Sequence, residues 1–357
     1  MTTTPTGTSA GRRARLGLLL QRQGALVALV LLIVIGALRY GERFVTGYNL
    51  SSFTGDTAKY GLVALGMTFV IMTGGIDLSV GSVVALGGVV AIKVSEHGLL
   101  AGLLAGVATG AAVGAVNGLL ITKLKLQPFI VTLATLLAVR GLALTLANTR
   151  GAVAAPGGFQ KLGDWSLLGL PVAAWAMLLA FLTGAAALHY TSWGRQVLAI
   201  GGNLDAAKLM GLPVARTTFS VYVLSGALAG CAGVFLGSQD GSVDTAAGQG
   251  WELSAIAAVV VGGTLLTGGV GSVLSSLVGV LLLQLIFNLI VFENGKHVIN
   301  VSSYWESVIR GAFLLIVVLL QIRQTKRAPP PGDPRHSQRA PAALPSAART
   351  QTDIPRV

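Results

Sequence analysis

The sequence predicts an all-α polytopic membrane protein, because its bulk properties do not fit a soluble globular domain. Hydrophobic residues make up 53% of the 357 residues and charged residues 11%, against about 25% charged residues in an ordinary soluble domain. The mean hydropathy is +0.75, and apolar runs recur through the middle of the chain. The 48 glycines also fit this class, because membrane-spanning helices contain glycine more often than soluble helices do.

The apolar runs leave room for about ten spanning helices joined by short loops. A helix needs ~20 residues to cross ~30 Å of hydrocarbon. The runs that we expect to be helical are 24–38, 60–73, 79–95, 98–121, 128–147, 167–189, 217–237, 252–267, 271–292 and 305–321. Several runs are shorter than a full span, so their boundaries stay open, and one or two could be broken or re-entrant helices.

The basic residues are concentrated at the two ends of the chain. Residues 1–23 contain four Arg and no acid, and residues 321–357 contain seven Lys or Arg and two Asp, so the ends carry +9 of the formal charge of +12. Basic segments beside apolar spans stay in the cytoplasm and are attracted to anionic headgroups. We therefore expect cytoplasmic N and C termini, with loops 122–127, 190–216 and 268–270 on the same side. No recognition module accompanies the charge, which argues against nucleic-acid binding.

The same pattern divides the chain into three parts. We expect a basic cytoplasmic N-terminus over 1–23, a transmembrane domain over 24–321 and a cytoplasmic tail over 322–357. The tail is rich in Pro, Ala, Arg and Ser and lacks apolar periodicity, which predicts disorder. The first apolar run follows basic residues, as a secretory signal does, but no clean cleavage site follows it, which favours a retained helix.

The most informative segment is GMTFVIMTGGIDLSVGSVVALGG, residues 66–88, where glycines interrupt an apolar run. Gly74 and Gly75 let the backbone leave helical geometry or let another helix approach closely. Asp77 and Ser79 can each cap the start of the next helix. Irregular backbone at membrane depth must face protein or a water-filled cavity. Two interpretations stay open, namely a capped tight turn at the membrane edge and a substrate pathway or gate.

Three further segments make the pattern more specific. They are PFIVTLATLLAVRGLAL at 128–144, GRQVLAIGGNLDAAKLMGLPV at 194–214 and GGTLLTGGVGSVLSSLVGVLLL at 262–283. Together with TGGIDLSVGSVVALGG, they resemble the ribose-type monosaccharide permeases of ATP-binding cassette (ABC) importers, a group that includes the branched-chain amino acid permeases. The resemblance runs through most of 60–320. It implies a type II ABC importer-like permease in a bacterial plasma (inner) membrane.

A short helix is predicted between two spans, within residues 199–213. Asn203 is a suitable N-cap for a helix from Leu204 to Met210, and a glycine and a proline end it. Such a helix is too short to be stable alone and needs a partner surface, either the membrane or another protein. The resemblance implies that it is the coupling helix, which docks on a separate ATPase subunit. The residues expected to form this coupling loop are Gly201, Asn203, Leu204, Asp205, Ala206, Ala207, Lys208, Gly211 and Pro213.

Polar residues inside the predicted spans are candidates for the substrate pathway. Hydroxyl and amide groups replace the hydrogen bonds that a sugar makes to water, but they also join helices to one another. The candidates for the pathway or gate are Asp77, Ser79, Thr68, Asn117, Arg140, Gln284 and Asn288.

Two predicted spans contain an arginine, and each of these charges must face protein, water or an interface. Arg310 follows Glu306 by four residues, so the two share a helix face and can pair. Arg140 has no acid nearby in the sequence. For both arginines an anchoring role near a helix end stays open, and for Arg140 a role in a cavity stays open as well.

Glycine pairs recur in the second half of the chain. Gly262 and Gly263 repeat the pair at 74 and 75, and Gly-Ser-Val at 271–273 repeats the triplet at 81–83. Internal duplication is common in transporters. Close packing of helices through small residues explains the same glycines without duplication.

The resemblance implies monosaccharide import by alternating access. A soluble extracytoplasmic sugar-binding protein would deliver the sugar to two permease subunits, a homodimer or a heterodimer, and a partner ATPase with tandem cassettes would use ATP and Mg. The chain lacks a G-x-x-x-x-G-K-[ST] loop and its four histidines are scattered, so we expect no enzyme activity, bound cofactor or metal.

Two alternatives stay open. The first is a permease for branched-chain amino acids or another small polar solute. The second is an ion-coupled secondary transporter, which would need titratable groups near the membrane middle, where the predicted spans have few beyond Asp77 and the two arginines.

Overall fold

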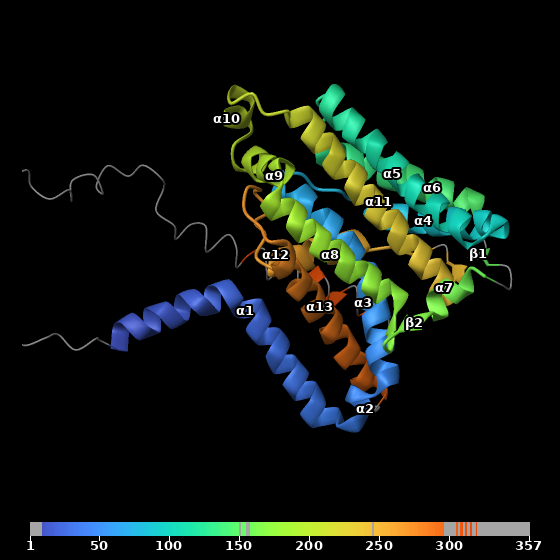
Figure 1. Cartoon of the computed structure of the whole chain (residues 1–357), viewed down its shortest axis with the longest axis horizontal. Helices are drawn as coiled ribbons and strands as arrows, with labels where there is room; N and C mark the ends of the chain where they lie inside the picture. The colour runs from blue at the N-terminus through green and yellow to red at the C-terminus, as the bar shows by residue number, and fades with distance from the viewer. Residues whose placement is uncertain are drawn as a thin grey trace, which may run out of the picture. The chain divides into compact units, whose positions relative to one another are not determined.

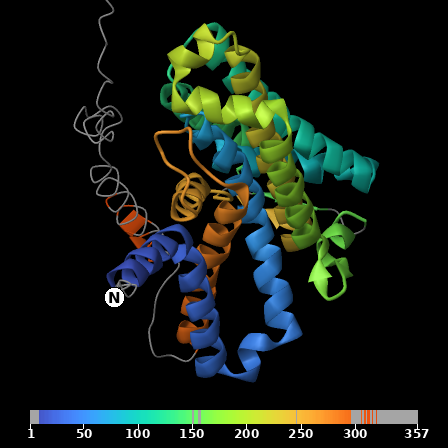
Figure 2. The same ribbon diagram turned by 60° about the vertical axis from the view of Figure 1, so that its left-hand side comes forward.

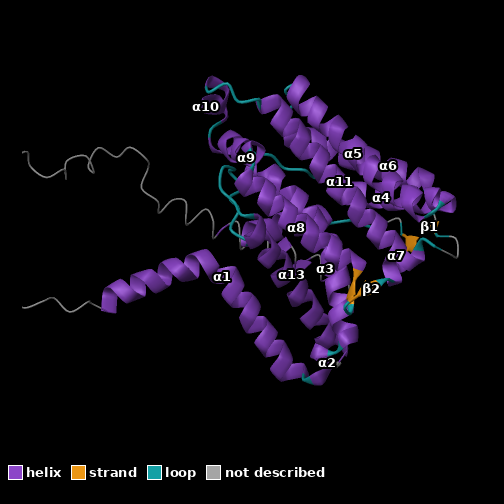
Figure 3. Cartoon of the chain, in the orientation of Figure 1, coloured by secondary structure: helices purple, strands orange, loops and turns teal. Residues whose placement is uncertain are grey.

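A computed structural model describes residues 9–149, 151–154, 158–244 and 246–295, together with scattered residues between 305 and 319. This described part is almost entirely helical (Figure 3). Six of its helices are long and apolar enough to cross a membrane, and two further apolar helices are shorter. The predicted all-α polytopic class is therefore confirmed. The count of ten stays a prediction, because the run 305–321 lies largely outside the described residues.

The elements follow one another as a chain of helices with two small strand pairs in the described residues (Figure 1). The helices are α1 (Ser9–Tyr40), α2 (Glu42–Val45), α3 (Gly47–Met72), α4 (Val80–Val94), η1 (Ser95–His97), α5 (Leu99–Lys123), α6 (Pro128–Leu146), α7 (Gln160–Asp164), α8 (Val172–Tyr190), α9 (Ser192–Gly202), α10 (Leu204–Leu209), α11 (Val214–Asp240), α12 (Trp251–Val261) and α13 (Val273–Gly295). Strand β1 (Ala152–Val153) pairs antiparallel with β4 (Ser242–Val243), and β2 (Ser166–Leu167) with β3 (Leu170–Pro171).

Helix α4 forms the centre of the bundle, packed against α5, α6 and α11. Of its span, 67% is buried by protein, against 22% for α5 and for α6. The contact between α5 and α11 is made by glycines at every fourth position of α5, from Gly106 to Gly118. A Cβ added to Gly110 would overlap the carbonyl oxygen of Gly226. The glycines therefore allow the close helix packing that the sequence predicts.

The loops segregate to two ends of the bundle. Helices α9 and α10 lie at one end, and β1, α7 and β2 lie at the other (Figures 1 and 2). The α5–α6 loop lines one cavity together with α10, and the α12–α13 loop touches the end of α9. The loops 122–127, 190–216 and 268–270, which were predicted to share a side, therefore share one end.

Two predicted runs extend several residues past the ends of their helices, and a third, 60–73, misses the first part of α3, which already begins at Gly47. The run 167–189 begins as a helix at Val172, because Leu168 and Gly169 have φ of 54° and 79° and form the two-residue turn of the β2–β3 hairpin. The run 252–267 ends as a helix at Val261, where two glycines follow.

In the N-terminal half, the start of the first helix and the position of Lys59 also differ from what the sequence predicts. Helix α1 begins at Ser9, inside the segment expected to be a basic N-terminus. Lys59, which the predicted spans leave just outside a helix, lies on α3 with 4% of its surface exposed and pairs with Asp56 at 3.0 Å. Glu306, Arg310 and the tail 322–357 lie outside the described residues.

Helices α3 and α12 end in the same way. The amide of Gly74 donates to Ile71 O at 2.8 Å, and the amide of Gly263 donates to Val260 O at 3.0 Å. Both glycines have positive φ, 80° and 92°, as the C′ residue of a glycine-capped helix does. In each case the next residue donates to the carbonyl that precedes this acceptor by one position. Each glycine pair therefore supplies the C′ residue of a helix, as its first member in the pair at 74 and 75 and as its second in the pair at 262 and 263.

Candidate functional site

The linker between α3 and α4, residues 73–79, re-enters the helix bundle. Asp77 and Ser79 are each 1% exposed. Asn117, which bonds to Ser79, lies six residues before Lys123 at the end of α5, which is about 9 Å along the helix axis. The Asp77 end of the linker is thus buried inside the bundle, whereas Gly74 is exposed, and the linker places a carboxylate among three helices.

The carboxylate of Asp77 is held by three donors. Its Oδ1 accepts from the backbone N of Ser79 at 3.0 Å and from the Ser79 hydroxyl at 2.6 Å, and its Oδ2 accepts from the Ser225 hydroxyl at 2.9 Å. Because Asp77 caps the amide at the start of α4, Ser79 has its side chain free to bond elsewhere, and it makes no capping bond of its own. Of the two residues that the sequence predicts as caps, the side chain of Asp77 caps the start of α4 and that of Ser79 does not.

Asn117 extends these bonds to two more helices. Its Nδ2 donates to the Ser79 hydroxyl at 2.9 Å, and its Oδ1 accepts from the Thr135 hydroxyl at 2.6 Å. We name the set Asp77, Ser79, Asn117, Thr135 and Ser225 the Asp77 network. It joins the linker to α5, α6 and α11, so the position of the linker depends on how these helices pack.

The backbone of the linker is held as well. The carbonyl oxygen of Ile76 accepts from the Thr132 hydroxyl at 3.3 Å and from the Tyr222 hydroxyl at 3.5 Å. Sequence reasoning missed Thr132, Thr135, Ser225 and Tyr222. The sequence shows each of these residues as a hydroxyl in an otherwise apolar helix. It does not show which residue the hydroxyl contacts.

The remaining pathway candidates lie apart from the Asp77 network. The Thr68 hydroxyl donates to Ala64 O of its own helix at 2.7 Å, inside the core. The Asn288 amide donates to Asn49 Oδ1 at 3.2 Å and joins α13 to α3. The Asn288 bond matches the second role given to polar residues in spans, joining one helix to another, whereas the Thr68 bond stays within α3.

Arg140 is half-buried on α6, and its Nη1 donates to the carbonyl oxygen of Ala247 at 2.6 Å. Glu252, at the start of α12, lies within electrostatic reach. Arg140 has no acid nearby in the sequence, and the fold brings this distant one close to it. Arg140 therefore anchors α6 to the β4–α12 segment.

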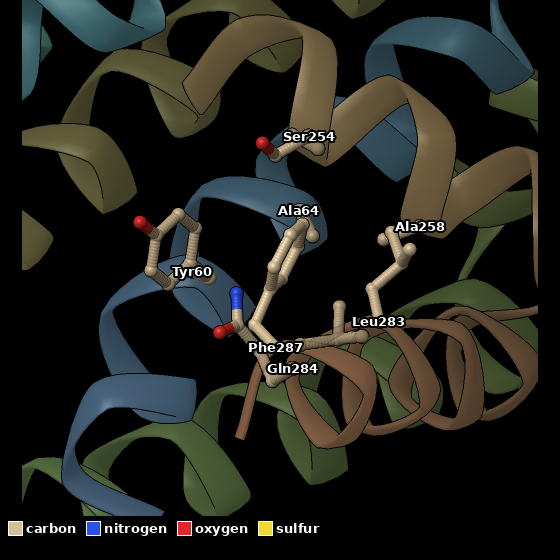
Figure 4. Close-up of a pocket in the computed structure, with 9 residues that line it drawn as sticks. Tyr60, Ala64, Ser254, Ala258, Leu283, Gln284 and Phe287 are labelled. Carbon is tan, nitrogen blue, oxygen red and sulfur yellow. The ribbon is translucent and has the colours of Figure 1, made fainter. Parts of the chain in front are cut away.

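Gln284 lines a small cavity between α3, α12 and α13 (Figure 4). Figure 4 shows Tyr60, Gln284 and Phe287 grouped together, with Ser254 on the neighbouring helix. Trp251 lies beside them, because its ring centroid is 4.1 Å from that of Tyr60. The cavity measures about 10 Å³, roughly the space of one water molecule. Aromatic rings beside an amide and a hydroxyl are suited to a sugar, but this conformation is closed to one.

A larger cavity, about 680 Å³, lies between the α3–α4 linker and the coupling loop. It is lined by Thr73, Gly74, Gly75, Ile121, Thr122, Lys125, Leu126, Gln127, Pro128, Ile200, Leu204, Lys208, Val214, Ala215, Thr218 and Tyr222. Its size is that of a small-molecule site. The linker and the coupling loop therefore border one space at the same end of the bundle.

The coupling loop has the local structure that the sequence predicts. Asn203 Oδ1 accepts from the amide of Ala206 at 2.9 Å and caps α10. Lys208 pairs with Asp205 at 3.2 Å on the exposed side. Ala207 is buried against the bundle, whereas Leu209 is 90% exposed and Met210 is 67% exposed. The loop thus ends in two apolar side chains that protrude from the bundle.

Comparison with known proteins decides the family. The family described as "Branched-chain amino acid transport system / permease component" matches residues 49–318, which include the Asp77 network and the coupling loop. The chain belongs to this permease family. No solved structure matches it.

Several curated relatives of this permease are similar over nearly their full length. The ribose import permease protein RbsC of Bacillus subtilis is 42% identical over 310 residues, covering 86% of this chain and 94% of the relative. RbsC of Escherichia coli K12 is 38% identical, covering 88% and 98%. The L-arabinose ABC transporter permease protein AraH of Azospirillum brasilense is 37% identical, covering 90% and 95%. The resemblance to sugar permeases is therefore confirmed, and this permease is a multi-pass membrane protein.

Proposed function

We propose that this permease is the membrane-spanning subunit of an ABC importer for a monosaccharide of pentose size. The relatives are named for import of ribose and transport of L-arabinose, both pentoses. The observation that carries the ATP-driven mechanism is the exposed apolar end of α10, beside the cavity that reaches the α3–α4 linker. A capped helix that protrudes from the bundle is suited to a groove on a second protein.

The end of the bundle that carries α10 is the cytoplasmic one in this proposal. Its loops contain Lys123, Lys125, Arg195, Lys208 and Arg216, and basic residues are retained in the cytoplasm. The termini lie on the same side. A tandem-cassette ATPase docks there and binds ATP and Mg, while this chain binds no cofactor and hydrolyses nothing. An extracytoplasmic sugar-binding protein docks at the opposite end.

Two permease subunits, identical or different, enclose the sugar and expose it alternately to the two sides. The Asp77 network holds the linker at the cytoplasmic half of the path, where Asp77, Ser79 and Asn117 act together as a gate. Gln284, with Tyr60 and Ser254, meets the sugar when the small cavity opens, since an amide and two hydroxyls match the hydrogen bonds of a sugar.

The docking of the ATPase is tested by two exposed leucines at opposite ends of the bundle. Leu209 on α10 is 90% exposed, and Leu168 at the β2–β3 turn is 85% exposed. Leu209→Asp should weaken ATPase binding to detergent-solubilised permease on the order of 30-fold, as loss of about 2 kcal/mol at an interface hot spot does. Leu168→Asp is the matched control and should leave this affinity unchanged.

The same binding measurement can contradict the docking of α10 on the ATPase. If both variants hold the ATPase as tightly as the unaltered permease, α10 lies on the membrane and not in a groove of the ATPase. A permease that takes up leucine and not pentoses would instead support the amino-acid branch of the family.

A further inference from the structure

Three glycine-containing segments meet at the end of the bundle that carries α10. They are the residue after the C-cap of α3, the end of α9, and the loop between α12 and α13. We name Gly74, Gly201, Gly268 and Gly269 the glycine junction. These residues come from three distant parts of the sequence, and backbone meets backbone there.

At Gly201, Gly268 and Gly269 the contacts leave no room for a side chain. A Cβ on Gly201 would overlap the carbonyl oxygen of Met72 and would lie 2.5 Å from the amide nitrogen of Gly269. A Cβ on Gly268 would lie 2.8 Å from the nitrogen of Gly74 and 3.1 Å from the Cα of Gly201. The amide of Gly269 also donates to Met72 O at 3.0 Å. The three segments are thus in direct contact, and a hydrogen bond joins the α12–α13 loop to the end of α3.

Each segment leads to a part of the permease to which the proposed function gives a role. Gly201 lies two residues before Asn203, the N-cap of α10. Gly74 lies three residues before Asp77 in the linker. Gly268 and Gly269 lie between α12 and α13, the helices that supply Ser254 and Gln284 to the small cavity. The glycine junction therefore brings together the coupling loop, the Asp77 linker and the loop that joins the two cavity helices.

We propose that the glycine junction carries movement of the coupling loop to the Asp77 linker and to α12 and α13, so that Gly201, Gly268 and Gly269 are positioning residues for transport. Close-packed protein has low compressibility and therefore transmits a displacement from one segment to the next. Where backbone contacts backbone, no side chain lies between the segments that could rotate and absorb the displacement. A shift at the end of α9 must then displace Met72 and the α12–α13 loop. The proposal rests on the proposed function, because the ATPase is what moves the coupling loop.

Two adjacent glycines provide a matched test. A Cβ on Gly202 would meet no atom of the described residues within 4 Å, whereas one on Gly201 would collide with Met72 O. Both are at the end of α9, and neither has a positive φ. Gly201→Ala and Gly202→Ala are compared in liposomes that contain the permease, its cognate ATPase and its binding protein, with [14C]ribose or [14C]arabinose as the probe and ATP hydrolysis measured in parallel.

Gly201→Ala should keep ATP hydrolysis within about twofold and lower the sugar transported per ATP about tenfold, a usual size for lost coupling between sites. Gly202→Ala should match the unaltered complex in both. A Gly201→Ala complex with an unchanged ratio of sugar to ATP overturns the proposal. Lack of ATP-dependent uptake by the unaltered complex would instead contradict the proposed function.

A reversible cross-link tests the glycine junction even where Gly201→Ala does not assemble. Gly202 and Val270 are changed to Cys in a Cys231→Ala background; both positions are exposed, and the Cβ position of Gly269 lies 2.6 Å from the Cα of Gly202. A reducible bifunctional thiol reagent then joins them in the assembled complex. If the segments move together, the linked complex transports the probe sugar. Loss of transport on linking, with recovery on reduction, means that they must separate, and this result overturns the proposal.

Discussion

The side-chain amide of Asn117 donates a hydrogen bond of 2.9 Å to the hydroxyl of Ser79, which itself donates to Asp77 at 2.6 Å. A residue on α5 therefore fixes the orientation of the hydroxyl that helps to hold the buried carboxylate in the α3–α4 linker. The order of donors follows from the chemistry, because a carboxylate only accepts and the amide nitrogen only donates. Changes on α5 should thus be felt in the linker.

Removing the carboxylate of Asp77 should destabilise the permease. Asp77→Ala leaves three buried donors without their acceptor, and a buried unsatisfied group costs about 1–3 kcal/mol. Thermal unfolding of the purified permease in detergent measures the effect, and Asp77→Ala should unfold at a clearly lower temperature. Asp205→Ala removes an exposed carboxylate as the control. Equal unfolding temperatures for the two variants would contradict the role given to Asp77.

Asn117 and Thr135 should be energetically coupled. The Thr135 hydroxyl donates to Asn117 Oδ1 at 2.6 Å, and residues in one hydrogen-bond network have interaction energies of about 0.5–3 kcal/mol. In a double-mutant cycle, Asn117→Ala with Thr135→Val should destabilise less than the sum of the single changes. Thr109→Val is the control partner, because Thr109 donates to Ala105 O of its own helix. Additive effects in both cycles would exclude the coupling.

The N-cap of α10 should matter for binding of the ATPase. Asn203→Ala removes the bond to the amide of Ala206, and loss of such a cap costs about 1 kcal/mol. The helix should fray and the affinity for the ATPase should fall about fivefold. Asn203→Asp keeps an acceptor at the same place and should restore the affinity. Should the Ala and Asp variants bind the ATPase equally well, the cap has no part in docking.

Gln284 should affect the sugar and not the ATPase. Gln284→Leu removes an amide from the cavity between Tyr60 and Ser254, and loss of a hydrogen bond to a polar substrate costs about 1 kcal/mol or more. The KM for uptake of [14C]ribose should rise several-fold, with ATPase binding unchanged. Asn288→Leu, one turn further along α13, breaks a bond to Asn49 and should lower stability without changing KM. A KM that changes in the second variant and not in the first would exclude Gln284 from the pathway.

The parts of the site that the sequence predicted correctly are those set by local chemistry. The cap by Asn203 and the helix end near Gly211 depend on residues a few positions apart. Asp77 likewise caps an amide two residues away. Its partner Ser225 is 148 positions distant, and no periodicity of one segment reveals which hydroxyl of another will face it.

The errors in the predicted helix boundaries also arise because hydropathy does not measure specific interactions. A hydropathy run continues through Leu168 and Gly169, although positive φ angles turn the chain there before α8 begins. Lys59 reads as a loop residue because of its charge, but on α3 it is buried beside Asp56. Hydropathy averaged over a window of sequence measures neither the turn at Leu168 and Gly169 nor the ion pair between Lys59 and Asp56.

The most direct test of the account is sugar accumulation in liposomes that contain the purified permease, with ATPase and ATP inside and binding protein outside. The account predicts that [14C]ribose or [14C]arabinose accumulates with ATP, does not accumulate with a non-hydrolysable analogue, and does not accumulate when the ATPase is omitted. Accumulation by the permease alone, driven by an ion gradient, would contradict it.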